Sequence, residues 1–295
     1  MSAFLAVAAD VPRKIRTSWL FWILLVLGVG IILFLGLSVN VKPDKDVGQV
    51  ATFWGQEIKD QEAAFARASA EKMIAFFIGS FLDFFVCYAG VFAGLVLMAD
   101  AVTSAFGPGQ AELNIPKPVH RATLILARHT GALFVATFFA VLVVAGTTLT
   151  VYLRTKIFVP HFLALIPVSV AGFAILHALG AISGIVMRNA LFGVFGSVGV
   201  WIVAVVSNIP NWPLLKDFEK IDYPLLVTFI KALRVTHRIL PRPNDLPDLS
   251  ERIMIGKFGV APHELRNELE LIGNALGWWA LALVLAILVV RRRDF

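Results

Sequence analysis

Long apolar runs separated by short polar segments dominate the hydrophobic pattern of this chain. The runs free of Asp, Glu, Lys and Arg are 17–41, 129–153, 157–187, 189–215 and 271–290. A further run at 73–99 is interrupted only by Asp83. Since a helix needs about 20 apolar residues to cross the hydrocarbon core of a bilayer, the pattern predicts six spans, near 19–39, 73–98, 130–153, 161–187, 190–209 and 274–290.

The overall composition agrees with a membrane protein. Hydrophobic residues make up 58% of the 295 residues and charged residues 16%, whereas soluble domains contain about 45–50% and about 25%. The ten-residue alternating segments of a membrane barrel are absent from the sequence. With the single cysteine Cys87, the chain cannot form an internal disulfide or a cysteine-based metal site. We therefore expect an all-α integral membrane protein with six transmembrane helices.

Basic residues near the span ends predict the orientation. Both termini are basic, which places both in the cytoplasm, as an even number of spans requires. The net charge of +6 then reflects topology and contact with the lipid bilayer and gives no sign of nucleic-acid binding. The chain is expected to form one domain, 1–295, with an interfacial segment at 1–18, outer loops at 40–72 and 210–272, and a cytoplasmic region at 99–129.

Three polar segments show helical amphipathicity or helix-forming composition. The N-terminal segment 2–18 predicts a helix in the inner interface. In the first outer loop, "FWGQEIKDQEAAFARASAEK" at 53–72 predicts an outward helical extension of the second span. In the second outer loop, "YPLLVTFIKALRVTHRILP" at 223–241 has separate basic and apolar faces and predicts an amphipathic helix.

Motifs for catalysis and nucleotide binding are absent from the sequence. No G-x-x-x-x-G-K-[ST], H-E-x-x-H or G-x-S-x-G occurs, and no paired carboxylates lie within the spans. We therefore expect no enzymatic activity, no cofactor and no metal site in this chain. Asp83 and His177 are the candidates for an intramembrane polar site. Alternatively, Asp83 lies near the interface or is capped by a neighbouring helix, and His177 is a hydrogen-bonded packing residue.

Two further features within the spans point to helix contacts and to the interface. The small residues Ala178, Gly180, Ala181, Ser183 and Gly184 predict a close helix–helix contact. Trp278 and Trp279 are expected to anchor the outer end of the last span in the membrane interface.

The cytoplasmic region between the second and third spans is longer than a turn requires. "GPGQAELNIPKPVHR" at 107–121 contains two glycines and three prolines, which fix where helices stop. Gly107-Pro108-Gly109 and Pro116-Lys117-Pro118 bound a short amphipathic element, and a new helix is expected from about Val119. Such an element predicts a rigid cytoplasmic projection on which another protein can act.

This region resembles the type 2 membrane-subunit family of ATP-binding-cassette (ABC) transporters. Those permeases carry an acidic residue after the second span, then Gly-Thr, a Leu-rich stretch, Ser-Lys-Pro-hydrophobic-Ser-Arg, and a basic residue before a glycine. Gln110 and Pro116 depart from the family's Thr and Ser, and the usual glutamate before the glycine is missing. The residues that match are Asp100, Gly109, Leu113, Lys117, Pro118, Val119, Arg121, Arg128 and Gly131.

Three other stretches are similar to the same family. "SGIVMRNA" at 183–190 matches the turn between the fourth and fifth spans, "ILPRPND" at 239–245 an outer-loop Leu-Pro element, and "RRRDF" at 291–295 the ending after the sixth span. The resemblance therefore extends over the whole chain with the same order of six spans.

The resemblance implies a permease subunit in a bacterial or archaeal cytoplasmic membrane. A separate ABC ATPase subunit would bind ATP and dock on this chain, which would pair with an identical or related permease subunit. The implied ATPase-coupling residues are Asp100, Gly109, Glu112, Leu113, Ile115, Lys117, Pro118 and Arg121. Two other functions stay open: an intramembrane enzyme that uses Asp83 or His177, and an ion-coupled secondary transporter.

Overall fold

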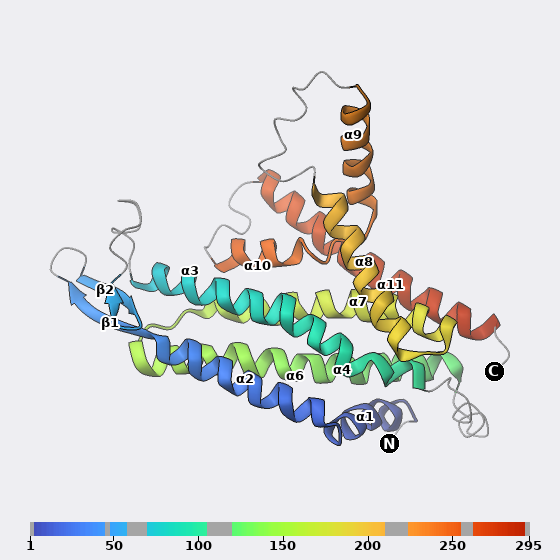
Figure 1. The fold of residues 1–295 in the computed structure, drawn as a ribbon, viewed down its shortest axis with the longest axis horizontal. Helices are drawn as coiled ribbons and strands as arrows, with labels where there is room; N and C mark the ends of the chain where they lie inside the picture. Colours follow the sequence, from blue (N-terminus) through green and yellow to red (C-terminus); the bar gives the residue numbers. More distant parts are fainter. Residues whose placement is uncertain are drawn as a thin grey trace.

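Six long apolar helices form the body of the molecule in the part of the chain that the structure describes. The computed structural model describes residues 3–44, 48–57, 70–104, 120–209, 224–254 and 262–292. The helices that are long and apolar enough to cross a membrane are Trp19–Ser38, Ala70–Thr103, Arg121–Thr155, Pro160–Met187, Ala190–Asn208 and Arg266–Arg292. They confirm the six predicted spans by length and composition. Figure 1 shows both chain ends at the same end of the bundle, as six crossings require.

The N-terminal segment forms the predicted amphipathic helix, α1 (Ala3–Arg16), which leads into the first span, α2 (Trp19–Ser38). Helix α1 packs on the third span through buried Val11. A Cβ atom added at Gly131 of that span would lie 2.5 Å from the Ala8 carbonyl oxygen and 2.8 Å from the Val11 Cβ. The absence of a side chain at Gly131 thus allows the two helix backbones to approach closely.

The first outer loop corrects the all-α prediction. Strands β1 (Val39–Asp44), β2 (Gly48–Phe53) and β3 (Gln56–Glu57) form an antiparallel sheet in that order. Residues 53–57, which we expected to begin a helix, are therefore in strands and a turn. The remainder of that expected helix up to residue 69 lies outside the described residues, and helix begins again at Ala70. The sheet lies at the end of the bundle opposite the chain termini (Figure 1).

Strand pairing, burial and a tight turn explain why this part of the chain forms a sheet. Val39 pairs with Phe53, and Val39 and Ala51 are completely buried. Trp54 and Gly55 have positive φ angles of 55° and 78°, so they connect β2 to β3 by the two-residue turn that suits the twist of a hairpin. The turn forms although residues with high helix propensity follow it in the sequence.

The second span contains an irregular segment in its middle. Helix α3 (Ala70–Asp83) is followed by the π-helical segment η1 (Phe84–Gly90) and then by α4 (Val91–Thr103). A π-helical turn inserts an extra residue into the hydrogen-bonding ladder and is frequent at functional sites. Asp83 is the last residue of α3, directly before this change.

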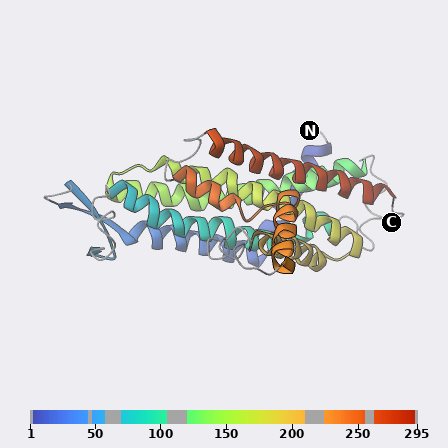
Figure 2. The same cartoon turned by 90° about the horizontal axis from the view of Figure 1, so that it is seen from above.

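The fourth span lies at the centre of the bundle. The third span is α6 (Arg121–Thr155), and the short helix η3 (Pro160–Ala164) leads into α7 (Leu165–Met187). Helix α7 packs against α4, α6 and the fifth span, α8 (Ala190–Asn208). Seen from above, α6 and α7 lie between the last span on one side and α3 and α4 on the other (Figure 2).

The predicted small-residue contact joins α7 to α8. A Cβ atom added at Gly180 would lie 2.0 Å from the Ser197 Oγ and 2.4 Å from the Gly193 carbonyl oxygen. The Ser197 hydroxyl donates back to the Leu176 carbonyl oxygen at 2.8 Å. Close backbone approach and this interhelical hydrogen bond together hold the two spans.

The second outer loop contains two helices before the last span. Helix α9 (Pro224–Ile239) confirms the predicted amphipathic helix, and α10 (Leu246–Met254) packs against α3 and α7. Helix α11 (Pro262–Arg292) starts well before the predicted span, so Trp278 and Trp279 lie in its middle. Both indoles have partners within the protein, because Trp278 donates to the Ile239 carbonyl oxygen and Trp279 to a buried histidine, and their role as interface anchors stays a prediction.

Candidate functional site

The candidate coupling region lies at the end of the bundle that carries both termini. Its middle, residues 105–119, lies outside the described residues, and so do the predicted coupling residues Gly109, Glu112, Leu113, Ile115, Lys117 and Pro118. Asp100, Arg121 and the two ends of the segment, Ser104 and His120, are described. The contacts of these ends show which helices the segment is connected to.

The first end is bonded to α1 and to α6. Lys14 of α1 forms an ion pair with Asp100 at 2.5 Å and lies 3.4 Å from the Ser104 hydroxyl. Both partners of the ion pair are about half exposed, so the pair contributes only about 0.2–1 kcal/mol. Arg128 of α6 donates from Nη1 to the Ala101 carbonyl oxygen at 3.0 Å and to the Ser104 Oγ at 2.9 Å. The last turn of α4 is therefore held by two other helices.

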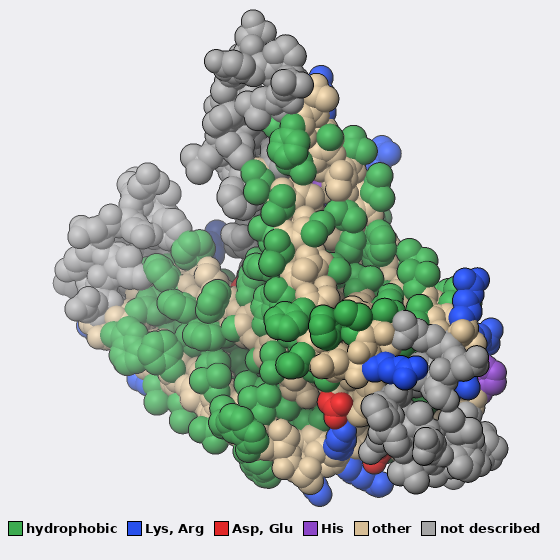
Figure 3. Space-filling model, turned by 45° about the vertical axis from the view of Figure 1, so that its right-hand side comes forward, with side chains coloured by type: hydrophobic (Ala, Val, Ile, Leu, Met, Phe, Trp, Pro, Cys, Tyr) green, Lys and Arg blue, Asp and Glu red, His purple; other side chains and the backbone are tan. Residues whose placement is uncertain are grey.

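The second end is bonded to the last span. His120 caps α6, because its Nδ1 accepts from the backbone N–H of Ala122 at 3.4 Å. Arg121 then donates from Nη1 to the Val290 carbonyl oxygen of α11 at 3.3 Å. Figure 3 shows lysine and arginine side chains gathered at this end of the molecule, while hydrophobic side chains cover most of the remaining face.

An apolar cluster lies directly behind these polar contacts. Its buried members come from α4, α6, α7 and α11. Because the side chains are closely packed, a displacement of one helix end also moves the other three. The cluster consists of Val102, Ile125, Ala181, Ile185, Ala286 and Val290.

A buried hydrogen-bond chain connects the same helices farther into the bundle. The Nδ1 atoms of His129 and His177 are 2.9 Å apart, and the Trp279 Nε1–H donates to the His129 Nε2 at 2.9 Å. His177 also lies within hydrogen-bonding reach of the backbone carbonyl of Met98. Both histidines are at least 95% buried, with 2% and 5% exposure.

The donors and acceptors along this row of hydrogen bonds determine which ring nitrogen of each histidine carries a hydrogen. Tryptophan only donates, so the His129 Nε2 must carry no hydrogen and its Nδ1 must carry one. That hydrogen is donated to the His177 Nδ1, so the hydrogen of the His177 ring is on Nε2. The hydrogen-bonded row therefore runs from α11 through α6 and α7 to α4, and both imidazoles are neutral. His177 is thus buried and hydrogen-bonded to a residue of a neighbouring span.

His129 and Trp279 were missed as partners of His177 in the sequence. His129 stands beside Arg128 at the start of a span, where a polar residue is unremarkable, and Trp279 resembled an interface anchor. Two polar residues separated by 150 positions carry no local signal of contact.

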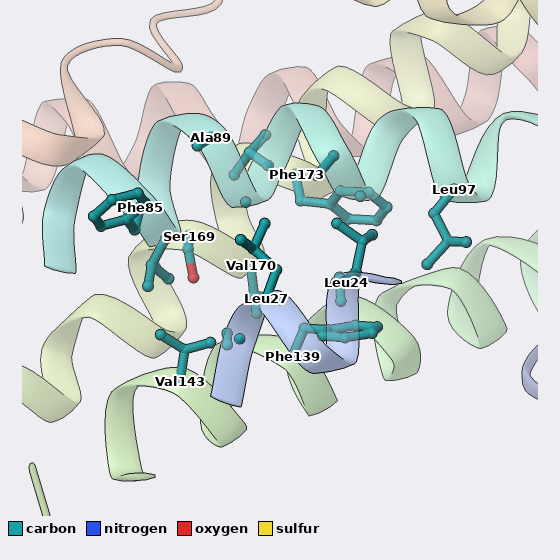
Figure 4. Close-up of a pocket in the computed structure, with 18 of the residues that line it drawn as sticks. Leu24, Leu27, Phe85, Ala89, Leu97, Phe139, Val143, Ser169, Val170 and Phe173 are labelled. Carbon is teal, nitrogen blue, oxygen red and sulfur yellow. The ribbon is translucent and has the colours of Figure 1, made fainter. Parts of the chain in front are cut away.

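A small apolar cavity lies deeper in the bundle, next to the π-helical segment. Its volume is about 110 Å³, and it lies between α2, α6, α7 and the second span. In Figure 4, Phe85, Leu24, Phe139 and Phe173 surround it. Ser169 is the one residue with a polar side chain among the described residues that line the cavity, and its hydroxyl donates to the Ile166 carbonyl oxygen. The cavity therefore suits a hydrocarbon group.

The two candidate intramembrane polar residues are not brought together. Asp83 is half-buried and hydrogen-bonded to the Cys87 thiol one turn away. Met98, next to His177, is 15 residues farther along the same span, which is about 22 Å at a helical rise of 1.5 Å per residue. Within the described ranges, no three His, Cys, Asp or Glu side chains form a potential metal site. No family model matches the chain, and no curated protein sequence matches it.

Proposed function

We propose that this chain is the membrane-spanning permease subunit of an ABC transporter. The observation that carries the proposal is that α1, α4, α6 and α11 are bonded to one another through the described residues that flank the segment 105–119. Its first end is bonded to α1 and α6 through Asp100, Ser104 and Arg128, and its second end to α11 through Arg121. A protein that pushes on this segment displaces several spans together. A separate ATPase subunit fits that role, because the sequence holds no nucleotide-binding loop of its own.

The ATPase would act by binding one arrangement of the spans more tightly than the other. ATP binding and hydrolysis in the ATPase change the shape of the surface that it presents to 105–119. If that surface fits one arrangement of the spans better, the equilibrium between inward and outward access shifts toward this arrangement. The chain itself supplies the transport path and the coupling surface and performs no chemistry.

The same proposal includes a dimer in a bacterial or archaeal cytoplasmic membrane. Large apolar side chains on α8, such as Leu191, Phe195 and Val203, are exposed in the single chain. Lipid or a second permease subunit covers such a surface in a membrane. The partner is expected to be an identical chain or a related permease.

The intramembrane enzyme and the ion-coupled transporter are the alternatives. An enzyme needs polar groups that converge at one depth, whereas Asp83 lies 15 residues before Met98, the residue of the second span that lies beside His177. An ion-coupled transporter commonly has matching broken spans in its two halves. The interruption at Phe84–Gly90 belongs to the second span, and we expect no counterpart to it in the other half.

Purification tests the proposal. The chain has a mass of 32.3 kDa. It is expressed together with the P-loop ATPases encoded by the same organism and purified in lipid discs. Native mass spectrometry then gives the mass of the particle. We expect two permease copies, or one copy and a relative, together with two ATPase copies. A particle with one permease copy and no bound ATPase would contradict both the assembly and the function.

A further inference from the structure

A polar cavity of about 820 Å³ lies between the last residue of α8, the C-terminal half of α9, α10 and the first turns of α11. Five arginines and four carboxylates are among the described residues that line it. The pocket is therefore unlike the small apolar cavity within the bundle in both size and chemistry. It is large enough for an organic ligand, since ligand pockets typically measure about 300–1,000 Å³.

The inner wall of this cavity is hydrogen-bonded within the protein. The Asp245 carboxylate accepts from the Asn208 Nδ2 at 3.1 Å and pairs with the His237 Nε2 at 2.9 Å. Glu268, which is buried, lies 3.9 Å from the Arg252 guanidinium. Asp245 has an amide and an imidazole partner, the nearest cation to Glu268 is Arg252, and the five lining arginines outnumber the four carboxylates, so the cavity does not favour a cation.

The rim of the cavity carries an excess of positive charge around one carboxylate. Glu270 accepts from the Arg242 Nη2 at 2.9 Å, and Arg238 and Arg266 also act on it electrostatically. Arg242 is bonded to Glu270 and two further arginines act on the same carboxylate, so these four groups together carry a net charge of +2. Arg238 and Arg266 are exposed and have planar donor groups that match phosphate and carboxylate oxygens. The rim is suited to bind an anion.

An apolar surface borders the same rim. On α9, Arg234 and Arg238 line the cavity, and Val235 and Ile239 follow each of them by one residue, about 100° around the helix. Val235 and Ile239 are 59% and 64% exposed. A basic row and an apolar row thus run side by side along α9, an arrangement that contacts both parts of an amphiphile.

We propose that this cavity binds the anionic headgroup of an amphiphilic molecule. Its phosphate or carboxylate would lie on Arg238, Arg242 and Arg266, and its hydrocarbon part along Val235 and Ile239. A small inorganic anion would leave most of 820 Å³ empty and would make no use of the apolar row. The site is independent of the proposed coupling to an ATPase, because binding here requires the permease chain alone.

A lipid titration of the full chain in uncharged detergent tests this site. Short-chain phosphatidylglycerol is compared with phosphatidylcholine of equal chain length, and bound lipid is counted by native mass spectrometry. We expect preference for phosphatidylglycerol and about tenfold weaker binding in Arg238→Gln/Arg266→Gln, since charge-assisted hydrogen bonds are lost. The control, Arg291→Gln/Arg292→Gln, removes equal charge from the other end of α11 and should bind like the wild type.

Three outcomes would overturn the proposal. One is equal binding of the two lipids by the wild-type chain. Another is an equal loss of binding in the control variant, which would indicate general charge attraction. The third is displacement of phosphatidylglycerol by inorganic phosphate at low millimolar concentration, which would assign the cavity to a small soluble anion. Loss of ATPase docking would leave all these measurements unchanged, so the two proposals fail separately.

Discussion

At the scale of single residues, the buried His129–His177 pair shows how few polar groups connect these apolar helices. Each imidazole has one donor and one acceptor position, and both are used within the protein. An apolar substitution of one histidine leaves the other imidazole without its partner, whereas replacement of both removes the two groups of that bond together and leaves the Trp279 Nε1–H as the donor without its acceptor.

This difference between single and double replacement predicts that the losses of stability in the two single variants do not add in the double variant. His129→Leu and His177→Leu should each lower the free energy of unfolding by about 1 kcal/mol, the size found for hydrogen bonds between membrane helices. The double variant should be less destabilised than the sum of the two. Unfolding in mild detergent, followed by tryptophan fluorescence, measures all three. Strict additivity would contradict the hydrogen-bond chain.

At the scale of elements, the sequence predicted the spans better than the loops. A span is specified by the cost of charge in hydrocarbon, which acts on every residue of a long run, and all six runs became helices. The β1–β3 sheet depends on a two-residue turn at Trp54–Gly55 and on the buried pairing of Val39 with Phe53. These are short signals, and the helix-forming residues that follow obscured them.

The candidate site was predictable only in part for a related reason. Its limits at Asp100 and Arg121 follow from prolines and glycines, which act locally. The contacts of Arg128 with Ala101 and Ser104, and of Trp279 with His129, join distant positions through the folded bundle. No periodicity within one helix reveals them.

The α7–α8 contact gives a prediction for a pair of elements. Gly180→Ala places a Cβ 2.0 Å from the Ser197 Oγ and 2.4 Å from the Gly193 backbone, so the helices must separate. We expect a loss of about 1–3 kcal/mol of stability, measured as a lower melting temperature in lipid discs. Gly199→Ala on α8 is the matched control, because nothing lies within 4 Å of an added Cβ there. Equal melting of the two variants would contradict the packing.

At the scale of the whole molecule, the account depends on which end faces the cytoplasm. Both termini lie at the same end of the bundle as the last turn of α4 and the start of α6, whereas α9 and α10, which line the polar cavity, lie away from this end (Figure 1). The basic termini favour the cytoplasm for the first end. An ATPase reaches the segment only with this orientation.

Cysteine labelling of intact cells tests the orientation. In a chain whose Cys87 is replaced by alanine, Ala232→Cys on the exposed surface of α9 should react with a membrane-impermeant maleimide from outside. Asn114→Cys should react only after the membrane is made permeable. The reverse pattern would place the segment 105–119 on the side without ATP and would exclude it as an ATPase contact.

The most direct test of the central claim is the response of the ATPase to changes in the segment 105–119. Leu113→Ser/Lys117→Glu removes an apolar and a charged group that are expected to contact the ATPase, and truncation of a buried interface anchor commonly costs about 1 kcal/mol or more. Both residues lie between the long apolar runs of the sequence, so membrane insertion should be unchanged. Arg188→Gln, at the other turn of this end, is the control.

The measurement is the affinity of the reconstituted complex for its ATPase, together with the rate of ATP hydrolysis with and without the permease. We expect at least about fivefold weaker binding for the double variant, loss of the permease-dependent change in ATP hydrolysis, and wild-type behaviour of the control. A double variant that inserts, binds the ATPase with wild-type affinity and preserves the response would contradict the account.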